Sequence, residues 1–159
     1  MKVIAVIPAR YKSTRFEGKP LVNLCGKPMI WWVHHQLCQV KGLSEIYVAT
    51  DDERIGKVCS DYGIKYVMTS DSHPTHLDRL AEFAENIESD FYININGDEP
   101  LMMPEYVERL LPTSDLNPAD FYFANAMTKI KKTVEVADIS RIKVVTDNLG
   151  YAMYMARTP

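Results

Sequence analysis

The sequence has few cysteines, and they show no metal-binding or redox spacing. Cys25, Cys38 and Cys59 are odd in number and contain no C-x-x-C pattern, which argues against a disulfide framework. We therefore expect a reducing, cytoplasmic environment. A chain of 159 residues buries enough apolar surface to form a core without such cross-links.

A long hydrophobic run is also absent. Five apolar residues, 3–7, precede Pro8 and Arg10, and this run is too short for the core of a signal peptide. No stretch approaches the ~20 apolar residues that a membrane span requires. We therefore expect a protein with no targeting or membrane segment.

Neither sign of charge is in large excess. The chain has 18 Lys and Arg against 21 Asp and Glu, for a net charge of −3. Such a balance does not favour global electrostatic binding to nucleic acid or membranes. Any anion-binding site must therefore be local.

Strand and helix patterns alternate along the first two thirds of the chain. Residues 3–7 form an apolar, β-branched run that is typical of a strand buried on both faces, and we expect it to stop at Pro8. Further strands are predicted at 46–49, 65–68 and 91–95. Helices are predicted at 28–40, from the capping sequence 50–53 to Gly63, after the Thr75-x-x-Asp78 cap, and from Pro104 onward. This alternation predicts an α/β fold with a doubly wound, mostly parallel, Rossmann-like sheet.

The last third of the sequence predicts strands at 121–126, 142–146 and 151–155. The last two flank Asp147-Asn148-Leu149-Gly150, which predicts a C-terminal β-hairpin. No linker or repeat is evident, so we expect one domain over 1–159. Since ligands of parallel sheets bind beyond the carboxyl ends of the strands, segments 9–27, 50–52, 69–79 and 96–100 should gather around one site.

The loop predicted after the first strand is basic. Residues 9–27 carry five cations and one acid, Glu17, together with Gly18 and Gly26. The guanidinium groups of arginine, the ammonium group of a lysine and backbone N–H groups turned inward can together bind the oxygens of a polyphosphate. The alternative is a solvated basic loop. A Walker A sequence, G-x-x-x-x-G-K-[ST], is absent.

Asn96-Gly97-Asp98-Glu99-Pro100 follows the fourth predicted strand. A carboxylate beside phosphate oxygens is a usual way to hold Mg²⁺, which makes Asp98 a candidate metal ligand. The alternative is a turn in which Gly97 supplies flexibility. A zinc site formed by Asp71, His73 and His76 is not favoured, because the spacing matches no common zinc pattern.

Several motifs, in order, resemble the 3-deoxy-manno-octulosonate (Kdo) cytidylyltransferase family. The resemblance extends over the whole chain and rests on residues 7–21, Gly26-Lys27-Pro28-Met29-Ile30, Val48-Ala49-Thr50-Asp51, residues 68–73, Asp78-Arg79-Leu80-Ala81-Glu82, Asn96-Gly97-Asp98-Glu99-Pro100, residues 142–145 and residues 150–154.

This resemblance implies a nucleotidyltransferase that uses Mg²⁺ to move CMP from CTP to an acidic eight-carbon sugar, releasing pyrophosphate, for surface polysaccharide synthesis. It implies a homodimer for a full-length member. It also implies catalytic roles for Arg10, Lys19 and Asp98, with Asp98 as the metal ligand. The nucleotide-binding residues that it implies are Ala9, Arg10, Ser13, Arg15, Lys19, Arg79 and Asn96.

The sequence departs from the family pattern at three places. Thr75-His76-Leu77 replaces the usual Ser-Gly-Thr, Asn96 replaces a common Gln, and the chain ends before the family's C-terminal part. The chain is therefore either a fragment or a shortened relative. The alternatives are transfer to another ulosonic or sialic-type sugar, a non-catalytic nucleotide-binding module, and a structural α/β domain.

Overall fold

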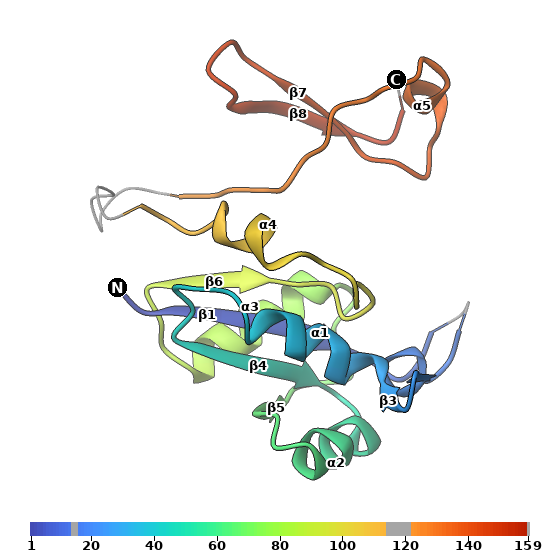
Figure 1. Cartoon of the computed structure of the whole chain (residues 1–159), viewed down its shortest axis with the longest axis vertical. Helices are drawn as coiled ribbons and strands as arrows, with labels where there is room; N and C mark the ends of the chain where they lie inside the picture. The colour runs from blue at the N-terminus through green and yellow to red at the C-terminus, as the bar shows by residue number, and fades with distance from the viewer. Residues whose placement is uncertain (14–15, 114–121, 159) are drawn as a thin grey trace. The chain divides into compact units, whose positions relative to one another are not determined.

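A computed structural model of the chain describes residues 1–13, 16–113 and 122–158 (Figure 1). Its contacts divide into two compact units, Met1–Leu116 and Asn117–Pro159. Each unit is described by itself below. The expectation of a single domain over 1–159 stays a prediction.

The first unit contains the expected parallel sheet. Its strands are β1 (Val3–Ala9), β4 (Glu45–Thr50), β5 (Tyr66–Met68) and β6 (Phe91–Asn94), in the order β5-β4-β1-β6. All three pairings are parallel, with Ile4 opposite Glu45 and Val3 opposite Phe91. The four predicted strands and the mostly parallel sheet are thus confirmed.

The expectation that the first strand stops at Pro8 is wrong. β1 continues through Pro8, which pairs with Ala49, to Ala9. On its other side β1 pairs with β6 only as far as Val6. Pro8 therefore lies where the strand has a partner on one side, a place where a missing N–H is tolerated.

Helices follow the strands as expected, with small differences at their ends. They are α1 (Met29–Leu37), α2 (Glu53–Asp61), α3 (His76–Asn86) and the short α4 (Pro104–Glu108). α1 ends before Val40, and α2 is capped by Asp52 rather than Thr50, because the Asp52 carboxylate accepts the Arg54 N–H. The capping box of Thr75 and Asp78 at the start of α3 is confirmed.

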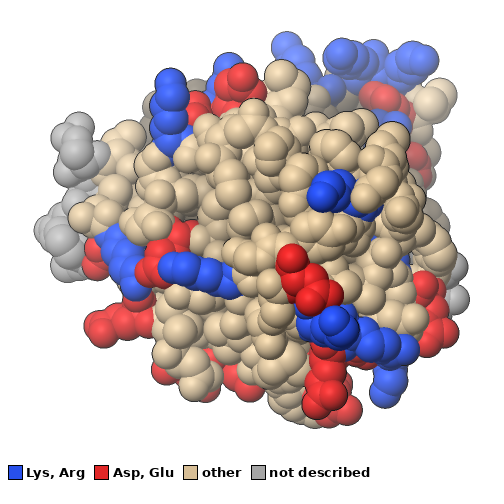
Figure 2. Space-filling model, turned by 60° about the horizontal axis from the view of Figure 1, so that its bottom comes forward, with Lys and Arg blue, Asp and Glu red and all other residues tan. Residues whose placement is uncertain are grey.

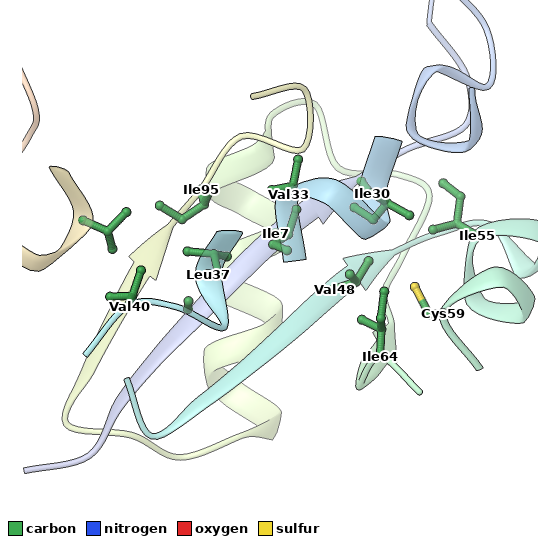
Figure 3. Close-up of a cluster of buried hydrophobic side chains, with 13 residues drawn as sticks. Ile7, Ile30, Val33, Leu37, Val40, Val48, Ile55, Cys59, Ile64 and Ile95 are labelled. Atoms are coloured by element: carbon green, nitrogen blue, oxygen red, sulfur yellow. The ribbon is translucent and has the colours of Figure 1, made fainter. Parts of the chain in front are cut away.

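Both faces of the sheet are covered. On one face, Ile7 and Val48 of the strands pack with Ile30 and Leu37 of α1 and with Ile55 of α2, all fully buried (Figure 3). On the other face Ile4, Val6 and Ala49 pack under Phe83 of α3. Each such side chain contributes ~1.5–3 kcal/mol by leaving water, so this sandwich fixes where the strand ends lie.

The predicted basic loop contains short regular elements that the sequence does not reveal. These are a 3-10 turn, η1 (Lys19–Leu21), and two paired two-residue strands, β2 (Asn23–Leu24) and β3 (Lys27–Pro28). Cys25 and Gly26 turn the chain with positive φ values of 51° and 88°, and the Asn23 side chain accepts the Gly26 N–H at 2.8 Å. Two-residue strands are too short to give a period-2 pattern.

The second unit contains the short helix α5 (Val134–Ala137) and a hairpin of β7 (Lys143–Thr146) and β8 (Ala152–Ala156). The predicted hairpin and its turn are confirmed, since Asp147 accepts the N–H groups of Leu149 and Tyr151. The predicted strand at 121–126 is wrong for 122–126, which form no helix or strand. Residue 121 lies outside the described residues.

Basic and acidic side chains are interspersed on the face of the molecule in Figure 2, as the near-neutral net charge leads one to expect. Among the described helices, none is long and apolar enough to cross a membrane. All three cysteines are free, and burial raises the pKa of Cys59 to about 12, so this thiol is a packing residue.

Candidate functional site

A pocket of about 390 Å³ opens at the carboxyl ends of β1 and β6. β1 and β6 are neighbours in the sheet, although β1 comes first and β6 last of its four strands in the sequence. The order in which strands are added to the sheet therefore reverses between them. Doubly wound sheets bind ligands at such a reversal. The lining residues come from the loop after β1, the start of α3 and the segment after β6: Pro8, Ala9, Arg10, Ser13, Phe16, Lys19, Pro20, His76, Asn96, Gly97 and Asp98.

The structure thus brings most of the predicted site residues to one place. Members of the predicted set that line this pocket are Ala9, Arg10, Ser13, Lys19, Asn96 and Asp98. Arg15 lies outside the described residues. Their assembly here follows from the topology, and their roles stay predictions.

The two segments that form the pocket meet through an ion pair. Lys19 Nζ donates to Asp98 Oδ2 at 2.6 Å, and the two side chains are 39% and 50% exposed. Gly97 lets the segment after β6 come close to β1, because a Cβ at this position would lie 3.2 Å from the Pro8 carbonyl oxygen. A side chain there would push the two strand ends apart.

Asn96 and Glu99 shape the rest of this segment. The Asn96 amide donates to Glu99 Oε1 at 2.9 Å. Asn96 also lines the pocket. Arg10 is exposed at the pocket, and Ser13 Oγ accepts the Phe16 N–H at a long 3.4 Å. The pocket therefore presents cations and the Ser13 hydroxyl beside the Asp98 carboxylate, which suits an anionic ligand with a divalent ion.

A second pocket of about 330 Å³ adjoins the first and shares Pro8, Ala9, Arg10 and His76 with it. The start of α3 and the segment before it complete its lining with His73, Pro74, Thr75 and Arg79.

Arg79 lies at the bottom of this second pocket and is 3% exposed. Its guanidinium donates to Asp51 at 2.8 Å and to the hydroxyl of buried Thr69. Arg79 therefore already joins the segments after β4 and β5. Asp51 was missed as a partner in the sequence analysis, although its place directly after a strand is a usable signal.

His73 is also tied to the scaffold. Its Nε2 contacts the carboxylate of Glu82, one turn along α3 from Asp78, and the same carboxylate accepts the Ser70 N–H at 2.8 Å. Hydrogen bonding by His73 holds the pKa of Glu82 below its usual range, as the Thr75 hydroxyl does for Asp78. These contacts fix the rim of the second pocket.

His76 lines the site although the sequence analysis gave it no role in nucleotide binding. It stands where the sequence departs from the family pattern, and its side chain lines both pockets. In the described residues no three His, Cys, Asp or Glu side chains form a metal-binding group.

A larger hollow, about 440 Å³, lies in the second unit between Thr128 and Lys143. Two of its basic groups have partners, since Arg141 pairs with Glu135 at 2.9 Å and Lys143 Nζ donates to backbone carbonyls. It contains no predicted site residue. The geometry thus favours the pockets of the first unit as the candidate site.

Known proteins of one family resemble this chain. A family model described as cytidylyltransferase matches residues 4–159. The 3-deoxy-manno-octulosonate cytidylyltransferase of Geotalea uraniireducens is 42% identical over 160 residues, covering all of this chain and 63% of the relative. The 8-amino-3,8-dideoxy-manno-octulosonate cytidylyltransferase of a Shewanella species is 41% identical over 161 residues, covering 99% of this chain and 66% of the relative.

A solved structure agrees in three dimensions. CMP:2-keto-3-deoxy-manno-octonic acid synthetase, complexed with CTP, superimposes with a TM-score of 0.87 at 38% identity, covering 99% of this chain and 65% of that chain. The α/β nucleotidyltransferase fold is thereby confirmed. This chain spans about 63% of the length of the curated relatives that it matches.

Proposed function

Because the chain belongs to the cytidylyltransferase family, we propose that it transfers CMP from CTP to an acidic 3-deoxy sugar, most simply Kdo, with release of pyrophosphate. The observation that carries the proposal is the pocket at the strand-order reversal, where Arg10, Ser13 and Lys19 face Asp98. It holds the charges that a nucleoside triphosphate and a divalent ion need.

Arg10, Ser13 and Lys19 bind the triphosphate in this proposal. Attack of a sugar hydroxyl on the α-phosphorus needs charge neutralisation and in-line positioning more than covalent chemistry by the protein. Arg10 and Lys19 supply positive charge from two ends of one loop, and Ser13 supplies a hydroxyl donor between them. We propose Arg15 as a further phosphate ligand from the sequence resemblance alone.

The second pocket binds the nucleobase side of the nucleotide. Ala9 is shared by both pockets and offers backbone groups, while Asn96 offers a side-chain amide from the adjoining first pocket. Arg79 donates to Asp51 and Thr69, so its part in nucleotide binding is to hold the floor of the pocket and to offer a remaining donor.

Asp98 holds Mg²⁺ in this proposal. Its half-exposed carboxylate points at the pocket and supplies the hard oxygen that Mg²⁺ prefers, while phosphate oxygens and water complete the coordination. The ion, when bound, neutralises phosphate charge and lowers the pKa of a bound hydroxyl. Lys19 contacts Oδ2 of the same carboxylate, and a divalent ion held by Asp98 would favour Lys19 turning toward phosphate, because the two cations repel each other.

Two sugars are candidates, because the relatives described above carry two different names at nearly equal identity: Kdo and 8-amino-3,8-dideoxy-manno-octulosonate. We propose Kdo first, another ulosonic or sialic-type sugar second, and a role in surface polysaccharide synthesis in the cytoplasm. A homodimer is the proposed assembly of a full-length protein.

The test is Mg²⁺-dependent pyrophosphate release from CTP by this chain with Kdo, 8-amino-Kdo, a sialic acid or no sugar. Release that requires CTP and one of the acidic sugars supports the proposal. Asp98→Asn should abolish most of it, and normal turnover by this variant in Mg²⁺ would show that the metal assignment is wrong. Tight CTP binding without release from any sugar would instead favour a nucleotide-binding module.

A further inference from the structure

The start of α2 contacts the basic loop through a stacked pair. The Arg54 guanidinium carbon lies 3.3 Å from the centre of the Tyr11 ring. Two hydrogen bonds to Asp52, 2.9 Å from Nε and 2.7 Å from the terminal nitrogen, hold the guanidinium in place. Asp52 is also the N-cap of α2. The direction of the Arg54 side chain is therefore fixed by the same carboxylate that begins the helix.

Tyr11 in turn closes the loop on itself. The Gly18 N–H donates to the Tyr11 carbonyl at 2.8 Å, and a Cβ on Gly18 would lie 3.0 Å from the Tyr11 ring. Gly18 has a φ of +67°, which a glycine adopts without strain. The Tyr11 ring is thus in contact with Arg54 of α2 and with the far end of its own loop.

The hydrogen bond between Gly18 and Tyr11 lies between the two cations of the site. Arg10 precedes Tyr11, and Lys19 follows Gly18. A movement of the Tyr11 ring would change the separation of Arg10 and Lys19 across the pocket. Arg54 itself does not line the pocket, so it acts on the loop through its contact with Tyr11.

We propose that Arg54 is a positioning residue: by stacking on Tyr11 it holds the loop in the form in which Arg10 and Lys19 face one ligand together. This inference rests on the proposed function for the nature of that ligand, a nucleoside triphosphate. It assigns to α2 a part in ligand binding through a contact outside the pocket. The planar guanidinium is required, because an ammonium group cannot both stack on the ring and donate two parallel hydrogen bonds to one carboxylate.

Two measurements on the whole chain test the proposal. The first is hydrogen exchange of the Gly18 amide without ligand, which reports the closure directly. Arg54→Ala and Arg54→Lys should each speed this exchange, whereas Tyr11→Phe, which keeps the ring, should not. The second is calorimetric titration with CTP and Mg²⁺, in which both Arg54 variants should bind roughly threefold to tenfold more weakly.

Lys57→Ala is the matched control. Lys57 is an exposed cation on the same helix, paired with Asp61 at 3.1 Å, and its loss should change neither measurement. The proposal is overturned if Arg54→Ala leaves Gly18 exchange unchanged, or if exchange rises while CTP affinity stays the same. If the unaltered chain binds no CTP, the proposed function fails, and Gly18 exchange alone then decides whether Arg54 holds the loop.

Discussion

Two ion pairs at the carboxyl end of the sheet differ in their exposure to water. Arg79 and Asp51 lie 2.8 Å apart with side chains 4% and 17% exposed, whereas Lys19 and Asp98 lie 2.6 Å apart at 39% and 50%. A buried pair must keep both members, because either charge alone is poorly solvated. An exposed pair contributes little stability and is free to exchange its partners. The first pair therefore serves the scaffold, and the second is available to a ligand.

The largest effect should come from breaking the buried pair. Arg79→Met leaves the Asp51 carboxylate largely buried without this guanidinium, and we expect the free energy of unfolding to fall by about 3–5 kcal/mol. Urea unfolding followed by circular dichroism measures this change. The double variant Arg79→Met/Asp51→Asn should recover part of the loss, because the uncompensated charge is gone. A loss below about 1 kcal/mol in the single variant would mean that Arg79 is no part of the scaffold.

The exposed pair should give the opposite result. Lys19→Met should change the free energy of unfolding by less than about 1 kcal/mol and weaken CTP binding roughly tenfold to a hundredfold, because charge-assisted hydrogen bonds to phosphate are lost. Calorimetry and urea unfolding on one preparation measure both quantities. Lys41→Met, which removes an exposed cation away from the pocket, is the control. If CTP binding weakened equally in the two variants, Lys19 would affect binding only through the net charge of the chain.

The two ion pairs also show which features of the fold and of the site could be predicted from the sequence. Apolar β-branched runs such as 3–7 and the alternation of strand and helix follow from local periodicity, and they were enough to predict the parallel sheet. The topology of such sheets then places segments 9–27 and 96–100 together. Asp98 is therefore a candidate from its place after the fourth strand, whereas Lys19, 79 positions away, is named by the family resemblance.

Burial of Arg79 could not be predicted in this way. At helical spacing Leu77 shares a face with the apolar residues Leu80 and Ala84, yet Leu77 is 57% exposed and Arg79 is 3% exposed. A buried arginine is stable only where partners are already in place, and Asp51 and Thr69 come from other loops. Tertiary pairing therefore overrides the local pattern at this turn of the helix. A sequence window contains no trace of such a partner.

A smaller effect should come from the close approach beside the exposed pair. Gly97→Ala places a Cβ 3.2 Å from the Pro8 carbonyl oxygen, which moves the segment bearing Asp98 away from β1. Since small displacements of binding groups are costly, we expect CTP affinity to fall roughly threefold to tenfold, with little change in stability. Calorimetry measures the affinity.

Gly26→Ala is the contrasting variant. Its Cβ would meet nothing within 4 Å, but Gly26 has a φ of +88°, a conformation that costs an alanine ~1–2 kcal/mol. It should therefore lower stability and leave CTP affinity unchanged. If Gly97→Ala behaves like Gly26→Ala, the close approach of the two strand ends is a feature of the fold alone.

The smallest effect should come from a third ion cluster, at the amino end of the sheet. Glu45 accepts hydrogen bonds from Lys65 at 2.8 Å and from Tyr47 at 2.7 Å, and Lys2 lies 3.1 Å away. The hydrogen bond from Lys65 is the main reason that the pKa of Glu45 falls from its usual 4.5 to about 2. A lowered carboxyl pKa stabilises the folded chain fully above about pH 4.5, and this contribution disappears as the pH falls toward 2.

Glu45→Gln should therefore lower Tm slightly at pH 7, and the difference from the unaltered chain should shrink between pH 4.5 and 2. Thermal unfolding across this range measures it, with Glu105→Gln, an exposed glutamate of α4, as the control for lost charge. Because this cluster lies at the end of the sheet opposite the pocket, CTP affinity at pH 7 should not change. A Tm difference that stays constant with pH would mean that Glu45 stabilises the fold by packing. Weaker CTP binding by Glu45→Gln would mean that the two ends of the sheet are coupled. That result would contradict the separation between ion pairs that serve the scaffold and the pair that is available to a ligand.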